Sequence, residues 1–502
     1  MTKISTVAYI KNEIIKMKKE VSKLDPKPLW EIFYKMTQIP RPSYHEERIQ
    51  EWAFNFGKKL GLETLKDEAG NVIIRKSATP GMENKKGVVL QGHLDMVPQK
   101  NSDKVHDFVN DPIETLIDGE WVTANGTTLG ADNGIGVSSA LAVLTSDSIK
   151  HGPLEVLLTA TEETGMDGAA GLKAGVLDGD ILINTDTEEE GTFSIGCAGG
   201  INVSALFRNK QKKPGKNFSA FQLKITGLKG GHSGVDIHLG RGNANKVFFR
   251  ILKVVSDNLG VKLAEINGGS LRNAIPREAF GLLIVKTKKA DELVSSVAEL
   301  SEIIKTELIN VEPDLHIEIE PADLPKTRMS GSLQKKLTAA VWAAPNDVIR
   351  MSDTMPGTVE TSSNLAIVKS NKDMVEIRCL VRSFSESAKM ALASRLESLF
   401  KLAGANVEID GSYPGWNPNI NSEILKIMKG LYQKQFGKKP ELLAMHAGLE
   451  CGILGATYPN WDMISIGPTI KFPHSPDEKV NIKTVQKYWD FLVNTLENVP
   501  EK

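Results

Sequence analysis

The chain has 502 residues, too many for one ordinary hydrophobic core, so we expect at least two domains. Its 41% hydrophobic and 25% charged residues are typical of a globular protein, and a formal net charge of −1 gives no basic field for nucleic acid or an anionic membrane. No apolar stretch approaches the length of a membrane span, and three scattered cysteines exclude a disulfide framework. We therefore expect a cytoplasmic protein.

The N-terminal segment predicts two helices. Residues 4–23 have apolar residues near one face, which is typical of an ordinary surface helix or a flexible extension. Lys and Glu interrupt this stretch, so it lacks the unbroken apolar region of a secretory signal. The following segment, LDPKPLWEIFYKMTQIP, predicts a second helix whose entry is marked by Pro26 and Pro28.

From about residue 71, short β-rich runs alternate with a helix rich in small residues. Such alternation predicts a mostly parallel sheet that is covered on both sides. Ligands of such sheets collect beyond the carboxyl ends of the strands. His93 follows VVLQG, Glu162 and Glu163 follow VLLTAT, and Asp186 follows ILINT. Three independent strand ends therefore predict one site.

The pattern changes near residue 200, where two strands surround a basic loop and long helices then alternate with further strands. This part predicts an inserted α+β domain over residues 200–412. The turn residues YPGWNPN, a helix and a strand then lead to His474, which has to return to the first domain if it joins the site. The first domain would comprise residues 1–199 and 413–502, with residues 1–23 as an extension.

A mixed set of imidazole and carboxylate groups suits a pair of divalent cations such as zinc, and one carboxylate can bridge two ions. Taken singly, each residue also has an ordinary interpretation. Asp132 fits the N-cap of the following helix, Glu162 and Glu163 fit a solvated edge, and His474 fits a surface loop. His232, in a glycine-rich segment, fits either a mobile surface loop or a loop over a site. The candidate set is His93, Asp95, Asp132, Glu162, Glu163, Asp186 and His474.

The combination resembles the zinc-dependent metallopeptidases that include carboxypeptidases, carnosinases, dipeptidases and tripeptidases. The likeness runs from LDPKPLW to KFPHSPDEKVNI and shows no departure in the metal-binding motifs, while the extension before Leu24 falls outside it. The segments that carry it are GHLDMVPQK, GTTLGADNGIG, TATEETGMDGA, NTDTEEEG, KGGHSGVDIHLGRGNA, SLRNAIPREA, HAGLECGIL and GPTIKFPHSPDE. The resemblance implies an α/β catalytic domain with a mixed, mostly parallel sheet and an inserted α+β lid or dimerisation domain.

The resemblance also implies roles for the metal-site residues. Asp132 would bridge two zinc ions, with manganese or cobalt as alternatives. His93 and Asp186 would complete one site, and Glu163 and His474 the other. Asp95 would support His93, and Glu162 would be the general base and acid.

For the substrate, the resemblance implies a second set of residues. His232 would polarise the scissile carbonyl, often in the active site of a partner subunit, so a homodimer is expected. Arg382 would bind the substrate carboxylate, with Arg378 as a nearby competitor for that role. Asn273, Gly448 and Glu450 would contact the substrate as well.

The implied reaction is hydrolysis of dipeptides, both those with histidine in the second position and related dipeptides without strict specificity, by a water that bridges two metal ions and that Glu162 deprotonates. Cleavage of tripeptides or acyl-amino acids on the same scaffold is a close alternative, because specificity depends on pocket shape. A metal-binding protein without catalysis is a third interpretation, against which Glu162, His232 and Arg382 argue. Nucleotide binding is disfavoured, because GADNGIG lacks the spacing of a dinucleotide fingerprint and the Lys of a phosphate loop.

Overall fold

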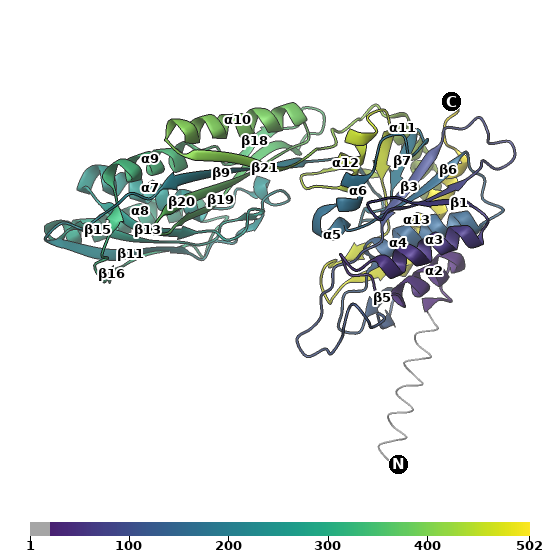
Figure 1. Cartoon of the computed structure of the whole chain (residues 1–502), viewed down its shortest axis with the longest axis horizontal. Helices are drawn as coiled ribbons and strands as arrows, with labels where there is room; N and C mark the ends of the chain where they lie inside the picture. The colour runs from purple at the N-terminus through teal and green to yellow at the C-terminus, as the bar shows by residue number, and fades with distance from the viewer. Residues whose placement is uncertain (1–20) are drawn as a thin grey trace, which may run out of the picture. The chain divides into compact units, whose positions relative to one another are not determined.

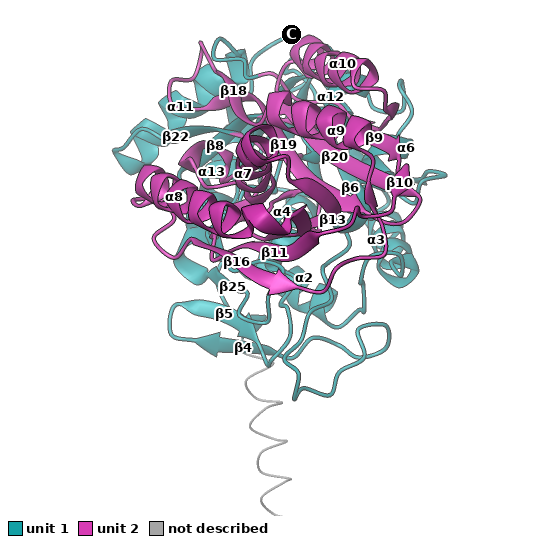
Figure 2. Ribbon diagram, turned by 90° about the vertical axis from the view of Figure 1, so that its left-hand side faces the viewer, with its two compact units in different colours: residues 1–196, 418–444, 449–502 teal, residues 197–417, 445–448 magenta. Residues whose placement is uncertain are grey.

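The computed structural model describes residues 21–502, so the helix expected over residues 4–23 lies almost wholly outside them. The chain divides into two compact units, which Figure 2 shows in different colours. Unit 1 comprises residues 1–196, 418–444 and 449–502, and unit 2 comprises residues 197–417 and 445–448. No helix among the described residues is long and apolar enough to cross a membrane.

The core of unit 1 is a mixed eight-stranded sheet with the strand order β1-β2-β6-β3-β7-β23-β8-β22 (Figure 1). The four strands β6, β3, β7 and β23 are parallel, and β1 and β2 are antiparallel additions at one edge. Every residue of β3 and β6 is buried, as expected for parallel strands covered on both faces. The strands are β1 (Glu63–Lys66), β2 (Val72–Lys76), β3 (Val88–His93), β6 (Leu154–Thr159), β7 (Ile181–Asn184), β8 (Thr192–Cys197), β22 (Glu441–Met445) and β23 (Asp462–Ser465).

Helices cover this sheet: α4 packs on β3, α2 packs on α4, and α3 packs on the edge strands β1 and β2. Gly134, Ser138, Ser139 and Ala142 keep α4 narrow, and every residue from Ala131 to Leu144 is buried. The helices of unit 1 are α2 (Lys27–Thr37), α3 (Glu47–Lys59), α4 (Ala131–Thr145), α5 (Glu162–Gly165), α6 (Asp167–Gly171), α11 (Glu423–Phe436), α12 (Glu450–Thr457) and α13 (Ile482–Glu497).

A second, four-stranded sheet in unit 1 was not predicted. It consists of β4 (Thr115–Asp118), β5 (Trp121–Ala124), β24 (Ile470–Lys471) and β25 (Lys479–Asn481), in the order β24-β25-β5-β4. Its register pairs Val480 with Val122. The loop between β24 and β25 carries His474, so this small sheet fastens a C-terminal loop to the first half of the chain.

Unit 2 is built on a nine-stranded antiparallel sheet with four helices packed on one face (Figure 2). Along β9 (Gly199–Arg208) buried and half-buried residues alternate, as expected for a sheet with one covered face. The other strands are β11 (Phe218–Thr226), β13 (Lys262–Gly268), β15 (Ala279–Lys286), β16 (His316–Ala322), β18 (Asp347–Met351), β19 (Val359–Ser370), β20 (Met374–Ser383) and β21 (Asn406–Tyr413). The helices are α7 (Ala244–Leu259), α8 (Ala290–Leu308), α9 (Gly331–Ala343) and α10 (Glu386–Leu402).

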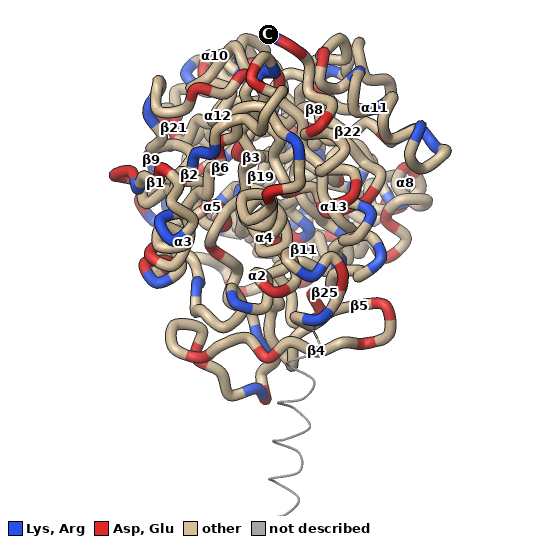
Figure 3. The backbone as a smooth tube through the Cα atoms, turned by 90° about the vertical axis from the view of Figure 1, so that its right-hand side faces the viewer, with Lys and Arg blue, Asp and Glu red and all other residues tan. Residues whose placement is uncertain are grey.

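The structure confirms the predicted parallel strands and the α+β character of the inserted segment. The predicted boundaries at residues 199/200 and 412/413 lie within a few residues of the unit boundaries, and the prediction did not include the short return of residues 445–448 to unit 2. Acidic and basic residues intermingle on the face shown in Figure 3, in keeping with a net charge of −1.

Candidate metal centre and substrate-binding residues

The register of the parallel strands brings three predicted residues to one edge of the unit 1 sheet. His93 is the last residue of β3 and pairs with Thr159 at the end of β6, two residues before Thr161 and the start of α5 at Glu162. On the other side of β3, Gln91 pairs with Asn184 at the end of β7, two residues before Asp186. The strand ends therefore converge, as the sequence predicted.

Asp132 lies between two histidines. Its Oδ1 atom is 3.1 Å from Nε2 of His93, and its Oδ2 atom is 3.2 Å from Nε2 of His474. The backbone of Asp132 is not helical (φ −78°, ψ 112°), although the residue lies within the first turn of α4. Each carboxylate oxygen therefore faces a different imidazole, which is the arrangement that a bridging ligand requires.

Each histidine also faces a second carboxylate. Nε2 of His93 lies 3.4 Å from Oδ1 of Asp186, and Nε2 of His474 lies 2.9 Å from Oε2 of Glu163. Three groups offer donor atoms that all lie within 4.8 Å of one another: His93 with Asp132 and Asp186; Asp132 with Glu163 and His474; and His93 with Glu162 and Glu163. Two of these groups share Asp132, so the donor atoms are arranged as two adjacent groups that could each hold a cation.

Asp95 supports this cluster by contacts with His93 and with the backbone of Glu162 and Glu163. Its Oδ1 atom lies 3.3 Å from Nδ1 of His93 and accepts a 3.0 Å hydrogen bond from the backbone N–H of Glu162. Its Oδ2 atom accepts hydrogen bonds from the backbone N–H of Glu163 (3.2 Å) and from the Ser43 hydroxyl (2.7 Å). One buried carboxylate thus orients both an imidazole and the turn that carries two acidic side chains.

Glu46, which the sequence analysis did not single out, also fixes this turn. The backbone N–H and the hydroxyl of Thr161 both donate to Oε1 of Glu46, at 2.9 and 2.8 Å. Thr161 has a left-handed backbone with φ 54°, which is costly for a residue other than glycine. The buried Glu46 carboxylate therefore stabilises the conformation that directs Glu162 and Glu163.

Two further buried residues without a predicted role hold the backbone of the metal-site loops. Glu478 accepts four backbone hydrogen bonds from residues 129–132, and Arg41 donates to the carbonyl oxygens of Leu94, Asp95 and Gly130. Glu478 stands in GPTIKFPHSPDE, one of the segments that carried the family resemblance, and Arg41 lies within the range over which the likeness runs. Nothing in the pattern of the sequence alone distinguishes them from surface charges.

Burial and mutual repulsion strongly perturb the acidic groups. Burial raises the pKa of Glu162 well above its ordinary value and raises the pKa of Asp186 to about 7. Asp132 and Glu163, which accept hydrogen bonds from the imidazole of His474, raise the pKa of His474 to about 11. Burial lowers the pKa of His93, but Asp186, Asp132 and Asp95 outweigh it and raise that pKa well above normal. Without a cation, protons on these histidines are needed to balance the acids.

A pair of divalent cations would balance this cluster of carboxylates and imidazoles better than protonation of the histidines would. Oδ1 of Asp186 is buried and accepts no well-formed hydrogen bond among residues 21–502; its contact with Nε2 of His93 is long (3.4 Å), and that nitrogen lies closer to Asp132 (3.1 Å). Imidazole nitrogens and carboxylate oxygens are ligands that zinc and manganese accept. The donor set therefore supports a two-metal centre.

In unit 2, the predicted substrate residues Arg382 and His232 lie together. Arg382 is buried on β20; its Nη1 donates to the hydroxyl of Tyr413 (2.8 Å), and its Nη2 lies 3.4 Å from Nε2 of His232. Nδ1 of His232 accepts from the backbone N–H groups of Val235 (3.1 Å) and Gly234 (3.3 Å). Burial, and then Arg382, lowers the pKa of His232.

These hydrogen bonds assign the tautomer of the His232 imidazole. An Nδ1 atom that accepts from two backbone N–H groups carries no proton, so the proton of the neutral ring is on Nε2. Nε2–H of His232 and Nη2 of Arg382 are then two donors that face the same region. Two convergent donors are suited to an anionic or carbonyl oxygen.

The remaining predicted residues have different surroundings. The backbone carbonyl of Asn273 accepts from Ser233 (2.8 Å), so Asn273 adjoins the His232 loop, whereas Arg378 is exposed and pairs with Glu376. Gly448 ends the short stretch that belongs to unit 2. Glu450 is 1% exposed, and its Oε2 accepts from Gln91 and from Thr159 (2.8 Å), which places its carboxylate beneath the sheet edge.

A second histidine of unit 2 was not predicted to be functional. Nε2 of His446 lies 2.7 Å from the Ser362 hydroxyl, and its ring packs edge-on against Phe384. Burial, together with Arg382 and His232, lowers the pKa of His446 to about 3. His446 is therefore a neutral, buried neighbour of the Arg382 and His232 donors.

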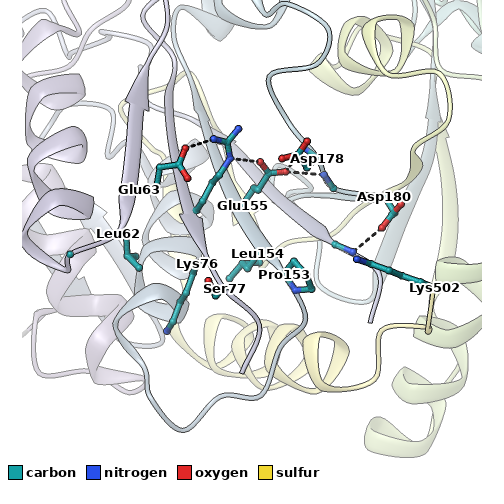
Figure 4. Close-up of a pocket in the computed structure, with 14 residues that line it drawn as sticks. Leu62, Glu63, Lys76, Ser77, Pro153, Leu154, Glu155, Asp178, Asp180 and Lys502 are labelled. Atoms are coloured by element: carbon teal, nitrogen blue, oxygen red, sulfur yellow. Dashed lines mark hydrogen bonds and ion pairs between the residues drawn. The ribbon is translucent and has the colours of Figure 1, made fainter. Parts of the chain in front are cut away.

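A cavity of about 400 Å³ in unit 1 lies away from this chemistry (Figure 4). It is lined by the start of β6, including Leu154 and Glu155, whereas the metal-site residues follow the end of the same strand. Three of its charged residues pair with one another: Arg75 lies 2.9 Å from Glu155 and also contacts Glu63. We assign this cavity no part in the site.

Comparison with known proteins agrees with the geometry. The model of peptidase family M20/M25/M40 matches residues 89–498. The cytosol non-specific dipeptidase of Escherichia coli (strain K12) is 51% identical over 483 residues, which cover 96% of this chain and 100% of the relative.

Solved structures give the same result. The aminoacylhistidine dipeptidase from Vibrio alginolyticus matches with a TM-score of 0.92 and 51% identity, covering 96% of this chain and 98% of the other. Aminopeptidase PepT from Bacillus cereus matches with a TM-score of 0.56 and 16% identity over 95% and 99% of the two chains. The second match shows a common fold alone.

Proposed function

This chain belongs to peptidase family M20/M25/M40, and we propose that it is a dipeptidase that acts through two divalent metal ions. The observation that carries the proposal is the carboxylate of Asp132, whose two oxygens face two separate histidines. The names of the two relatives at 51% identity support dipeptides as the substrate class. The Vibrio relative also supports a preference for histidine in the second position.

We assign the metal ligands from the donor groups. Asp132 would bridge the ions, His93 and Asp186 would complete one site, and Glu163 and His474 the other. When bound, the two cations supply an acidified water and polarise the scissile carbonyl. The ions are most simply zinc, with manganese and cobalt as alternatives that suit the same ligands.

Glu162 is the proposed general base and acid. Its burial disfavours the charged form and raises its pKa, the direction of shift that helps a carboxyl group to return a proton as well as to accept one. Asp95 accepts a hydrogen bond from its backbone N–H, and Glu46 accepts one from the N–H of the preceding Thr161, so two carboxylates fix the backbone at Glu162. Glu162 would take a proton from the attacking water and return it to the leaving amine.

In unit 2, Arg382 would bind the carboxylate of the substrate, and Nε2–H of His232 would donate to the scissile carbonyl oxygen, where negative charge develops. Tyr413 holds the guanidinium of Arg382 by a 2.8 Å hydrogen bond. Asn273 adjoins the His232 loop, and Gly448 and Glu450 are further candidates for substrate contact. Recognition of a free carboxylate would favour short peptides.

We propose a homodimer in the cytoplasm, in line with the name of the Escherichia coli relative for the compartment. His232 would then act in its own active site or in that of the partner subunit. Co-expression of a Glu162→Gln chain with a His232→Ala chain, each with its own affinity tag, distinguishes these cases. Activity in the doubly purified heterodimer but in neither homodimer would place His232 across the subunit boundary.

The experiment that tests the proposal is hydrolysis of a peptide panel by chelator-treated protein before and after zinc or manganese is restored. The panel contains carnosine, other dipeptides, tripeptides and acyl-amino acids. We expect cleavage only after metal is restored, confined to dipeptides and favouring histidine in the second position.

Other outcomes have distinct meanings. Cleavage of tripeptides or acyl-amino acids in preference to dipeptides would move the substrate to another group of the family and leave the metal chemistry unchanged. A protein that binds two ions and cleaves none of these substrates would contradict the proposed dipeptidase activity and favour the interpretation as a metal-binding protein.

A further inference from the structure

The loop that carries Asp132 is held by a buried carboxylate from the loop that carries His474. Glu478 is 1% exposed and lies four residues after His474. It accepts hydrogen bonds from four successive backbone N–H groups: Oε2 from Leu129 (2.7 Å) and Gly130 (2.9 Å), and Oε1 from Ala131 (2.7 Å) and Asp132 (3.2 Å). Both oxygens of Glu478 are thus used to fix the backbone of one loop.

Arg41 holds the same loop from its carbonyl side. Its guanidinium is 1% exposed, and Nη2 donates to the carbonyl oxygen of Gly130 (2.5 Å). Nη1 donates to the carbonyl oxygens of Leu94 and Asp95, both at 2.8 Å. Arg41 therefore joins the Asp132 loop to the segment that follows His93.

The position of Arg41 explains why two positions of LGADNGIG are glycines. Gly130 has φ 72°, and a Cβ atom there would lie 2.5 Å from Nη2 of Arg41. At Gly134 a Cβ atom would lie 2.8 Å from the same nitrogen. Any larger residue at either position would displace the guanidinium, so the motif provides room for Arg41.

A buried carboxylate and a buried guanidinium are an inefficient way to stabilise a fold. Removing two charges from water is costly, and a well-packed apolar pair in their place is often neutral or stabilising. Their retention is explained if the position of the backbone matters. The backbone in question, residues 129–132, ends at the residue that faces both histidines.

We propose that Glu478 and Arg41 are positioning residues of the metal centre: they fix the Asp132 backbone so that each of its oxygens serves one cation. Because Glu478 and His474 share a loop, Glu478 also ties the His474 side of the centre to the Asp132 side. Binding of one ion is thereby coupled to the geometry of the other. This inference rests on the proposed two-metal function.

Glu478→Gln is the direct test. The amide oxygen of Gln can still accept two backbone N–H groups, but its NH2 group faces the other two donors, so half of the interactions are lost. We expect the affinity for zinc to fall by about 10- to 100-fold, the usual effect of losing a group that supports metal ligands. We also expect kcat at saturating zinc to fall while KM is retained, and the visible absorption spectrum of the cobalt-substituted protein to change.

Glu155→Gln is the matched control. Glu155 is also a buried carboxylate of unit 1 that accepts two backbone N–H groups, from Asp178 (2.8 Å) and Gly179 (2.9 Å), and pairs with an arginine (Figure 4). It lies at the start of β6, at the opposite end of that strand from Glu162. This variant should lose thermal stability and retain the zinc affinity, kcat and cobalt spectrum of the unmodified protein.

Arg41→Lys is a second test variant, to be used if the Glu478→Gln protein does not fold. Lysine keeps the positive charge of Arg41 but makes fewer directed hydrogen bonds. We expect a smaller change of the same kind. The inference would be overturned if Glu478→Gln had unchanged zinc affinity and an unchanged cobalt spectrum. If only Arg41→Lys folds, the same result in that variant would overturn it. An equal loss of zinc affinity in Glu155→Gln would also overturn it. Failure of the unmodified protein to bind two ions would instead contradict the proposed function.

Discussion

Asp95 and Glu162 are joined by a 3.0 Å hydrogen bond, in which the backbone N–H of Glu162 donates to the same carboxylate oxygen of Asp95 that faces Nδ1 of His93. One oxygen atom therefore sets the position of a proposed metal ligand and of the proposed catalytic base. A perturbation of Asp95 should be felt in both metal binding and catalysis, which separates it from residues that serve only one of them.

Asp95→Asn should lower metal affinity and turnover together. An asparagine keeps one acceptor, but its NH2 group must face either a backbone N–H or the imidazole, and the charge that supports His93 is lost. We expect a 10- to 100-fold loss in metal affinity, measured by competition with a chelator. Ser43→Ala, which removes only the 2.7 Å hydrogen bond to Asp95, should have a much smaller effect. Equal losses in both variants would contradict this explanation.

Glu162→Gln should retain both metal ions and lose most of its activity. The amide has almost the same shape as the carboxyl group but cannot take a proton from water, so kcat should fall by about 10²- to 10⁴-fold. Steady-state kinetics and metal analysis of one protein sample measure both quantities. Glu189→Gln, at an exposed acid that pairs with Lys471, is the control and should be unchanged. Normal turnover in Glu162→Gln would exclude it as the base.

Asp132→Ala and His474→Ala should differ in the number of ions that they bind. Asp132 contacts both donor groups, whereas His474 belongs to one of them. We expect Asp132→Ala to bind close to no metal and His474→Ala to bind about one ion per chain. Metal content after dialysis against a buffered zinc solution gives the numbers. Two ions bound to Asp132→Ala would rule out its bridging role.

Arg382→Lys should weaken the binding of substrates that have a free C-terminal carboxylate. Lysine retains the charge but loses the planar pair of donors, and it cannot be held by Tyr413 in the same way. We expect KM for a dipeptide to rise by about tenfold or more. We expect the C-terminal amide of the same dipeptide to be a poor substrate of the unmodified enzyme, and its hydrolysis should change little in the variant. Arg378→Lys, at the exposed competitor position, should alter neither substrate. A larger effect of Arg378→Lys would exchange the two assignments.

His446 should make unit 2 sensitive to acid. Burial, with Arg382 and His232, lowers its pKa in the folded protein to about 3, whereas the unfolded chain has an ordinary value of about 6.5. The unfolded state therefore takes up a proton first as the pH falls below about 6.5, and stability that is present at higher pH is lost toward the folded-state value. At pH 5 this loss is about 2 kcal/mol.

Metal-free protein is the sample for this test, because metal binding has its own pH dependence. Denaturant unfolding at pH 7.5 and pH 5 should show a smaller decrease in the free energy of unfolding for His446→Gln than for the unmodified chain. His316→Gln, at an exposed histidine on β16 of the same unit, is the control. If His446→Gln loses as much stability on acidification as the unmodified chain, the buried histidine is not the cause.

The strands and the ends that carry the proposed ligands were predictable because β3, β6 and β7 are short apolar runs: β3 ends at His93, and Glu162 and Asp186 follow shortly after the ends of β6 and β7. The same reasoning did not find β24 and β25, since strands of two and three residues have no readable periodicity. Without them the sequence gives no reason for His474 to lie beside Asp132. That proximity depends on the pairing of Val480 with Val122, which only the folded chain reveals.

The supporting residues were missed for a different reason. Glu46, Arg41 and Glu478 act on backbone groups, and a charged residue that binds backbone leaves no partner in the sequence to recognise it. In the sequence, such residues cannot be told from ordinary exposed charged residues, and only the structure shows that they are buried. The proposed ligands could be singled out because imidazole and carboxylate groups are side chains that bind metals.

The position of β23 in the sheet has a consequence for how this protein folds during its synthesis. β23 (Asp462–Ser465) lies between β7 and β8, so during synthesis those two strands, made some 270 residues earlier, wait with their facing edges open. Open strand edges are templates for wrong pairing. All of unit 2 emerges from the ribosome before unit 1 closes and before His474 exists to complete the metal centre. A ribosome that stalls near residue 460 would release a chain with a finished insert and an unfinished, aggregation-prone catalytic sheet.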